Sequence, residues 1–214
     1  MSVIAPSITV ETTDQFRAAV EKFKPFARRV HIDISDGKFA PVLLFGPDGL
    51  FWPQEWTVDI HAMVSKPLDY LGRLIALKPH LITLHAETGI DLVPLLEQIK
   101  RSGIKAGIAL LQKTVPETVE NAIKVADHVL IFSGDLGHYG GTASMMQLEK
   151  IRLVKAINPN VEIGWDGGVA VNNAFILAKG GVDVLNTGGA ISNAVDSATV
   201  YAELTKEINK QGVI

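Results

Sequence analysis

Short apolar runs alternate with longer segments of helical period along the chain. The short runs are almost continuous in Val, Ile, Leu and Ala, which is typical of parallel strands buried on both faces. Eight such runs therefore predict eight strands. They are Val3–Ser7, Arg29–Ile34, Thr57–Met63, Leu81–His85, Lys105–Leu110, His128–Ser133, Glu162–Trp165 and Val182–Asn186.

The longer segments carry signals of helix ends. The helix predicted at Thr13–Phe23 follows a Thr-Thr-Asp cap, and the one at Pro67–Leu77 opens with Pro in its first turn. A third, Asp91–Arg101, stops at a Ser-Gly pair. Between the second and third strands, Lys38–Pro53 is rich in Pro and Gly, and we expect only a short helix there. The remaining predicted helices are Pro116–Ala126, Ser144–Ile157, Val171–Ala178 and Ser197–Lys210.

Eight βα units in 214 residues match the size of one compact (β/α)8 TIM barrel. An open, doubly wound sheet is the structural alternative, and the regular spacing of the units favours the barrel. No linker, low-complexity tract or shift in composition marks a second domain. Residues 1–214 are therefore interpreted as a single barrel domain.

Composition narrows the chemistry. Lys and Arg total 20 against 23 Asp and Glu, a net charge of −3 without runs of like charge, which gives no support for binding nucleic acid or an anionic membrane. The absence of cysteine excludes disulfides, Cys-ligated metals and a Cys nucleophile. Because the sequence shows neither a signal peptide nor an apolar run long enough to span a bilayer, we expect a cytoplasmic location.

Residues able to bind metals lie near the ends of three predicted strands that should otherwise be apolar. His31 and Asp33 are two positions apart and point to the same side of their strand. His61 and Asp166 occupy comparable positions on the third and seventh strands. Active sites of this fold lie at the carboxyl ends of the strands, so we expect the four to converge there. Two imidazoles and two carboxylates suit Zn, Mn, Fe or Co.

Taken alone, each of these residues also has a structural interpretation, as a hydrogen-bonded core His or as an Asp that caps a loop. The joint pattern favours the metal site. Asp59, two residues before His61, is either a cap or a partner that orients that ring. His85 either contacts the site or substrate or belongs to the core, and Ser7 either contacts a substrate hydroxyl or ends its strand.

Glycines cluster after the last three predicted strands. Loops after the seventh and eighth strands are the recurrent phosphate site of this fold. Glycine lets backbone N–H groups approach a phosphate, and few Lys or Arg lie in these loops, so the main chain would provide the binding. The alternative is that the glycines only form tight turns. The cluster comprises Gly134, Gly137, Gly140, Gly141, Gly167, Gly168, Gly188 and Gly189.

These motifs together resemble those of the ribulose-phosphate 3-epimerase family over nearly the whole chain. The segment HIDISDGKFAP at 31–41 is similar to the family's His-x-Asp-x-x-Asp-Gly-x-Phe-x-Pro signature. The segments APSI (5–8), DIHAM (59–63) and ITLHAE (82–87) resemble three further strands, and DGG (166–168) and GGAI (188–191) resemble the last two motifs. The first signature is quite specific, whereas the glycine motifs are shared with other phosphate-binding barrels.

The resemblance implies a metal-dependent carbohydrate epimerase that inverts C3 of a ketose phosphate, with D-ribulose 5-phosphate as the leading substrate. It implies His31, Asp33, His61 and Asp166 as ligands of a divalent metal, and no organic cofactor. Asp33 and Asp166 are also implied as the acid–base pair, which agrees with a reaction that removes a proton from one face of a carbon and returns one to the other, through an enediolate. The implied substrate contacts are Ser7, His31, His61, Gly140, Gly141, Gly167, Gly168, Gly188 and Gly189.

Departures from the family pattern lie around the pocket. Ser35 and Phe132 stand where the family has two of three methionines that cover the metal, and only Met63 is kept. The loop after the sixth strand, DLGHYGGT at 135–142, is one residue longer than the family pattern. Its added polar residues are His138 and Tyr139. The metal and acid–base residues are intact, but a ketohexose 6-phosphate such as allulose 6-phosphate becomes an alternative substrate.

Two other classes of function stay open. Related lyase and decarboxylase barrels carry Asp-x-Lys-x-x-Asp on the third strand, where this chain has His61 and Val64 at the Lys and second Asp positions. Lys66 and Lys113 lie just past strands, but neither ends a strand as a buried Schiff-base lysine should. A non-catalytic sugar-phosphate binder is supported only by the altered loop.

The apolar segments at 42–45 and 50–52 also have more than one interpretation. They are expected to pack in the core, to cover the barrel mouth, or to form the interface of a homo-oligomer.

Overall fold

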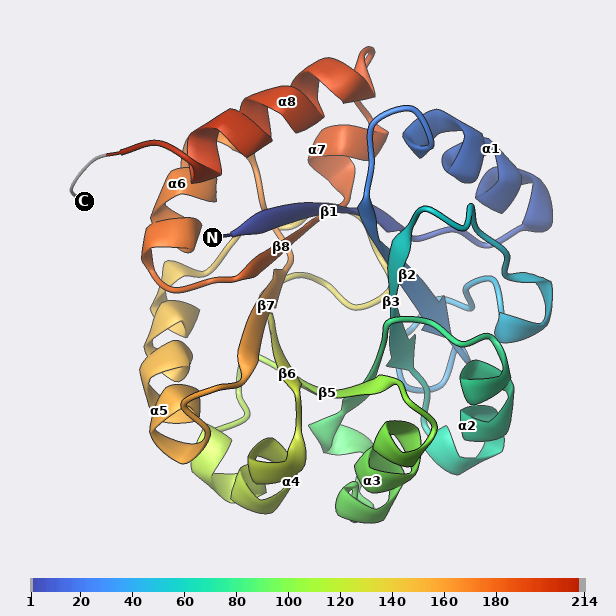
Figure 1. The fold of residues 1–214 in the computed structure, drawn as a ribbon, viewed down its shortest axis with the longest axis vertical. Helices are drawn as coiled ribbons and strands as arrows, with labels where there is room; N and C mark the ends of the chain where they lie inside the picture. The colour runs from blue at the N-terminus through green and yellow to red at the C-terminus, as the bar shows by residue number, and fades with distance from the viewer. Residues whose placement is uncertain (1, 212–214) are drawn as a thin grey trace.

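Eight parallel strands close into a barrel with helices around it (Figure 1). This computed structural model describes residues 2–211, so residues 1 and 212–214 of the predicted domain lie outside the described part. Each strand pairs with its neighbour in chain order, and β8 returns to pair with β1. The predicted (β/α)8 TIM barrel is thereby confirmed. The strands are β1 Val3–Ile8, β2 Arg29–Ser35, β3 Thr57–Met63, β4 Leu81–His85, β5 Lys105–Leu110, β6 His128–Phe132, β7 Glu162–Asp166 and β8 Val184–Thr187.

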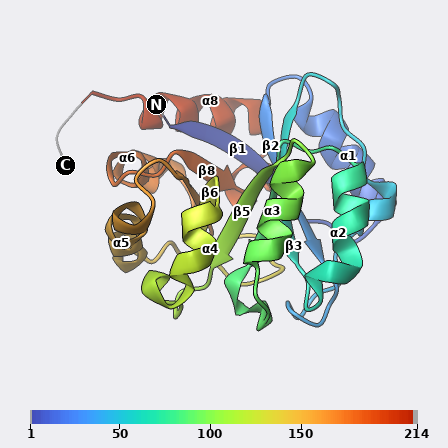
Figure 2. The ribbon, with the colours of Figure 1, turned by 60° about the horizontal axis from the view of Figure 1, so that its bottom comes forward.

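The helices follow the strands in chain order and form the outer layer, as Figures 1 and 2 show from two sides. The predicted helices at 116–126 and 144–157 begin as 3-10 turns, at Pro116–Val119 and Met145–Leu148. Lys38–Pro53 holds only the 3-10 turn Pro47–Gly49, as expected for a segment rich in Pro and Gly. The α-helices are α1 Thr13–Phe23, α2 Pro67–Ala76, α3 Val93–Arg101, α4 Glu120–Val125, α5 Glu149–Ile157, α6 Val171–Lys179, α7 Gly189–Ser192 and α8 Ser197–Ile208.

No helix among the described residues is long and apolar enough to cross a membrane. The 3-10 turn Ala86–Thr88 and helix α7 were not predicted, because three or four residues are too few to show a helical period.

Helix α1 shows how local sequence sets an element. The hydroxyl of Thr12 accepts a hydrogen bond from the backbone N–H of Gln15, and the Gln15 side chain accepts one from the N–H of Thr12. This reciprocal capping box satisfies two N–H groups that the first turn leaves free. Phe16, Val20 and Phe23 recur at helical spacing on the buried face, so the helix packs on the barrel through one stripe.

Strand β2 shows how alternation sorts side chains between two layers. Val30, Ile32 and Ile34 belong to the main apolar core of the molecule. His31 and Asp33 alternate with them and therefore point to the opposite face of the strand, into the barrel. The apolar layer stabilises the scaffold, and the barrel interior is left free to hold polar groups.

A polar cluster lies near the strand starts, and we call it the Arg29 network: Arg29, Asp59, His128 and Glu162. Arg29 Nε donates to Asp59 Oδ2 at 2.6 Å, and its Nη atoms donate to the Glu162 carboxylate at 2.8 and 2.7 Å. His128 Nδ1 lies 2.8 Å from the same carboxylate. Of the two interpretations of Asp59, the one in which it orients His61 is not supported, because the guanidinium of Arg29 on the neighbouring strand binds its carboxylate.

The apolar segment after β2 packs largely inward. The rings of Phe45 and Phe16 lie 5.4 Å apart between centroids, and Leu44 joins Met63 in a small cluster near the end of β3. Leu43 and Phe51 are the exposed members of the two predicted apolar segments, with 66% and 46% of their surfaces exposed. Phe45 thus packs against the main core, Leu44 lies near the barrel mouth, and the homo-oligomer stays a prediction.

Candidate functional site

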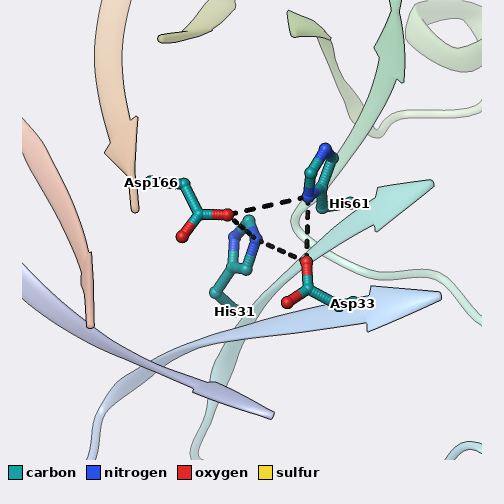
Figure 3. Close-up of side chains that lie close together, drawn as sticks. All are labelled: His31, Asp33, His61 and Asp166. Atoms are coloured by element: carbon teal, nitrogen blue, oxygen red, sulfur yellow. Dashed lines mark hydrogen bonds and ion pairs between the residues drawn. The ribbon is translucent and has the colours of Figure 1, made fainter. Parts of the chain in front are cut away.

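The four candidate metal ligands converge inside the barrel, at the carboxyl ends of three strands. His31 and Asp33 lie on β2, His61 on β3, and Asp166 ends β7. In Figure 3 their side chains point toward one another, and one ligand atom from each lies within 4.8 Å of the others. The convergence expected from the spacing of these residues is therefore present.

The distances between these atoms fit a divalent cation. Asp33 Oδ1 lies 2.9 Å from His61 Nδ1 and 3.2 Å from His31 Nε2. Asp166 Oδ2 lies 3.7 Å from His31 Nε2 and 3.8 Å from His61 Nδ1. Ligand atoms around a tetrahedral Zn²⁺, each about 2.0–2.1 Å from the metal, are roughly 3.3 Å from one another. The four residues could therefore hold a dication without moving the strands that carry them.

The two carboxyl groups titrate unequally. Burial opposes ionisation of Asp33, but the positive charge of His31 and hydrogen bonds from His31 and His61 hold its pKa well below the usual range. Burial, together with the charge of Asp33, raises the pKa of Asp166 to about 7. Without a cation the pair therefore carries one ionised and one protonated carboxyl near neutral pH. A bound dication would lower the pKa of Asp166, because it favours ionised ligands.

His85 and Glu87 continue the site away from the four-residue cluster. Burial lowers the pKa of His61 to about 4, which leaves the neutral ring that binds metals. His61 Nε2 lies 2.8 Å from His85 Nε2, and His85 Nδ1 lies 3.1 Å from Glu87 Oε2. When Nδ1 of His61 carries no proton, as a metal ligand requires, its Nε2–H donates to His85 Nε2, and Nδ1–H of His85 donates to Glu87. Of the interpretations that the sequence left open for His85, the structure supports contact with a site residue.

Glu87 is itself held firmly. The backbone N–H of Leu111 and the hydroxyl of Thr114 donate to its Oε1, at 2.8 and 2.5 Å. Its role was not predicted, although it lies two residues from His85 in a motif already noted. The chain of contacts from Glu87 to His61 is of the kind that fixes the tautomer of a metal-binding imidazole.

A cavity of about 260 Å³ adjoins the cluster, and both Asp33 and Asp166 line it. His31 and His61 are not among its lining residues, so the cavity gives no support for direct substrate contact by these two. Phe132 and Met63 contribute apolar surface to the wall. The other predicted substrate contacts all line the cavity: Ser7, Gly140, Gly141, Gly167, Gly168, Gly188 and Gly189.

Two polar atoms in the cavity wall have no hydrogen-bond partner among the described residues. They are Ser7 Oγ and Asn186 Oδ1, and both side chains are about 2% exposed. A buried polar group without a partner costs about 1–3 kcal/mol, so it marks a place where a ligand can supply the missing bond. Asn186 is the last residue of the eighth predicted strand, and its sequence position alone indicates no role for it.

Gly167 and Gly168 let two loops approach each other closely. Their φ angles are +107° and +69°, and a Cβ would come within 2.0 Å of the Gly134 nitrogen and 2.1 Å of the Ala143 nitrogen, respectively. Packing alone therefore requires glycine at both positions, as the structural interpretation held. No Lys or Arg in the described chain lines the cavity, so an anion there would depend on backbone N–H groups.

Thr9 and Tyr139 lie beside the cavity and were not assigned roles from the sequence. Thr9 Oγ1 donates to Asp33 Oδ2 at 2.5 Å, and the Tyr139 hydroxyl accepts from the backbone N–H of Thr9 at 2.8 Å. Alternation along β1 contains the signal for Thr9, because it shares a strand face with Ser7. Lys66 and Lys113 are exposed, so neither offers a buried amine.

Comparison with known proteins connects this geometry to a family. Residues 3–192 match the family model described as the Ribulose-phosphate 3 epimerase family. The chain is 29% identical to a ribulose-phosphate 3-epimerase from Aquifex aeolicus, over 92% of each chain. It is 30% identical to one from Rhodobacter capsulatus, over 94% of this chain and 91% of that protein.

A solved structure extends the likeness in fold only. The 3-hexulose-6-phosphate synthase of Salmonella typhimurium superposes with a TM-score of 0.70 at 15% identity, over 97% of this chain and 98% of that one.

Proposed function

Because this chain belongs to the ribulose-phosphate 3-epimerase family, whose members are carbohydrate epimerases, we propose that it inverts C3 of a ketose phosphate. The leading substrate is D-ribulose 5-phosphate, and the product is D-xylulose 5-phosphate. The observation that supports the proposal most directly is the placement of two carboxyl groups, Asp33 and Asp166, at the edge of one cavity. Epimerisation needs one group ready to accept a proton and another ready to donate one.

In this mechanism Asp33 removes the proton from C3, the electron pair of the broken C–H bond forms the C2–C3 double bond of an enediolate, and the carbonyl π pair moves onto the C2 oxygen. Asp166 then donates its proton to C3 from the opposite face. Asp33 ends protonated and Asp166 ionised, and proton exchange with solvent or turnover in the reverse direction restores the pair. We propose His31, Asp33, His61 and Asp166 as the ligands of a divalent cation. When bound, it supplies a Lewis acid that stabilises negative charge on the substrate oxygens.

The cavity wall supports a sugar phosphate as the substrate class. Ser7 Oγ and Asn186 Oδ1 are free to bind substrate hydroxyl groups. The glycine-rich loops after β7 and β8 would hold the phosphate through backbone N–H groups, as the recurrent phosphate site of this fold does. The reacting carbon would then lie between the two carboxyl groups, with the phosphate at the glycine-rich loops.

A ketohexose 6-phosphate is the second candidate, because His138 and Tyr139 enter the lining from a loop that departs from the family pattern. The lyase alternative has less support, since no Lys in the described chain lines the cavity and Schiff-base chemistry needs one there. The cytoplasmic location and the homo-oligomer remain predictions.

Turnover of D-ribulose 5-phosphate by metal-analysed protein tests the proposal. We expect epimerisation that is lost on chelation and restored by one of Zn²⁺, Mn²⁺, Fe²⁺ or Co²⁺. A panel of ketopentose and ketohexose phosphates, assayed in parallel, identifies the preferred sugar. Absence of turnover across the panel with every metal restored would reject the epimerase mechanism and favour a sugar-phosphate binder.

A further inference from the structure

Thr9 meets Asp33 at the point where β1 ends. In the pairing of β1 with β2, Ser7 lies beside His31 and Ile8 beside Ile32, so the next row brings Thr9 to Asp33. Thr9 Oγ1 donates to Asp33 Oδ2 at 2.5 Å. The other carboxylate oxygen, Oδ1, is the one near His31 and His61. Thr9 therefore holds the oxygen that the two histidines leave free.

Tyr139 reaches Thr9 from the opposite side of the cavity. It belongs to the loop after β6, which we call the 134–142 loop. The Tyr139 hydroxyl accepts a hydrogen bond from the Thr9 N–H at 2.8 Å and donates to the Ser7 carbonyl oxygen at 3.4 Å. Its ring lies against Gly188, where an added Cβ would come 2.7 Å from Cδ1. One side chain thus ties the 134–142 loop to the end of β1 and passes beside β8.

We propose that Thr9 is a positioning residue for Asp33, and that Tyr139 fixes Thr9 when the 134–142 loop lies over the cavity. A carboxylate held at one oxygen only can rotate, whereas hydrogen bonds at both oxygens fix its plane. The position of the 134–142 loop and the orientation of the Asp33 carboxylate are then coupled through Thr9. This inference rests on the proposed function only for the identity of the reaction, because the orientation of Asp33 also affects metal binding.

Thr9 also makes the surroundings of the two carboxyl groups unequal. Asp33 is approached by the Thr9 hydroxyl and by two imidazoles. Among the described residues, no side-chain hydroxyl hydrogen-bonds to Asp166. A simple packing role for Tyr139 would require the ring but not its hydroxyl, and a simple packing role for Thr9 would be met equally by valine. These two differences make the proposal testable.

The experiment compares Thr9→Val, Thr9→Ser, Tyr139→Phe and the Thr9→Val/Tyr139→Phe double variant. Affinity for Co²⁺, followed by its absorption spectrum, is measured beside kcat and KM for D-ribulose 5-phosphate. For Thr9→Val we expect kcat and Co²⁺ affinity each to fall about tenfold with KM nearly unchanged, as loss of an outer partner of a metal ligand commonly causes. Thr9→Ser should stay within about threefold of the parent, because it keeps the hydroxyl.

Tyr139→Phe should lower kcat by about threefold or more, and should add less than about twofold when Thr9 is already Val, because coupled groups are not additive. Tyr201→Phe and Thr118→Val, both outside the cavity lining, are the matched controls and should match the parent. The proposal is overturned if Thr9→Val leaves both readouts unchanged, if Thr9→Ser is as impaired as Thr9→Val, or if the two substitutions multiply. If the parent turns over no sugar phosphate, the proposed function fails, while the Co²⁺ affinities still decide the role of Thr9.

Discussion

The barrel carries a charged cluster near each end, and the two clusters differ in what neutralises them. In the Arg29 network, one guanidinium donates to both carboxylates at 2.6–2.8 Å. Burial opposes ionisation of Glu162, but Arg29 and His128 hold its pKa well below the usual range. At the carboxyl end no Arg or Lys among residues 2–211 lines the cavity, and the pKa of Asp166 is raised. Similar groups therefore stabilise the fold at one end and are left poised for chemistry at the other.

Polarity inside a barrel is therefore not by itself a sign of a functional site. The Arg29 network satisfies nearly all of its own groups, with Asp59 Oδ1 the exception. The cluster of His31, Asp33, His61 and Asp166 could hold a cation, and it adjoins a cavity whose wall holds unpaired polar atoms. Missing partners, rather than charge, distinguish the candidate site.

The largest expected difference between the ends is in catalysis. Asp33→Asn and Asp166→Asn should each reduce the rate of epimerisation by roughly a thousandfold, the range expected for loss of a general acid or base. Asp59→Asn should change it less than about threefold at a temperature where the variant is folded, because Asp59 lies outside the cavity lining. Epimerisation followed by NMR measures all three, and near-parental turnover in either site variant would contradict the assigned roles.

The free energy of unfolding should instead depend most strongly on the Arg29 network. Glu162→Gln removes one carboxylate of the Arg29 network and should cost about 2 kcal/mol in urea unfolding at pH 7, since it leaves a buried guanidinium short of a partner. Glu97→Gln is the control, because its ion pair with Arg101 is exposed and should contribute less than about 1 kcal/mol. The loss of unfolding free energy in Glu162→Gln should become smaller as pH falls below 4.5. Because the pKa of Glu162 is lowered in the folded protein, the parent loses the stabilising contribution of this carboxylate in that range.

Metal affinity tests the outer part of the site. His85→Phe removes the group beside His61 Nε2 and should weaken Co²⁺ binding about tenfold at pH 8, because the imidazole tautomer is no longer fixed. His80→Phe is the control, since His80 is half-buried and outside the cavity lining. Equal affinities for the two variants would show that the His61–His85 contact does not support the metal site.

The two ends also show what could be predicted from sequence. On β2, alternation was enough to separate Ile32 and Ile34 from His31 and Asp33, and the same spacing rule identified the candidate ligands. Asp59 precedes His61 by the same two residues, yet its partner is Arg29 on the neighbouring strand. Which side chain lies opposite depends on the register between strands, and register is not a local property of the sequence.

Contacts made by the loops also could not be predicted from the sequence. Tyr139 and Thr9 are 130 positions apart and meet only because the closed barrel brings the loop after β6 to the end of β1. Residue type indicated that Tyr139 adds a polar group near the pocket, but not which atom it would bind. Short-range pattern therefore predicts strands and ligand candidates well, whereas contacts across the barrel mouth require the fold.

The smallest expected effect is a gain in stability from removing the unpaired charge. Because burial and the charge of Asp33 raise the folded-state pKa of Asp166 to about 7, its contribution to stability is lost as pH rises from its ordinary value of 3.8 through 7. Chelated Asp166→Asn should therefore match the parent near pH 4 and exceed it by about 1 kcal/mol at pH 8, where the parent must ionise a largely buried carboxyl. Urea unfolding at the two pH values measures this, and Asp14→Asn, on the exposed first turn of α1, should show no such divergence. Glu162 is present in both the parent and Asp166→Asn, so its titration affects the two unfolding free energies equally and cancels from their difference. A constant gap between parent and Asp166→Asn across this range would mean that Asp166 is not held near its neutral form, and the contrast between the two ends of the barrel would lose its electrostatic basis.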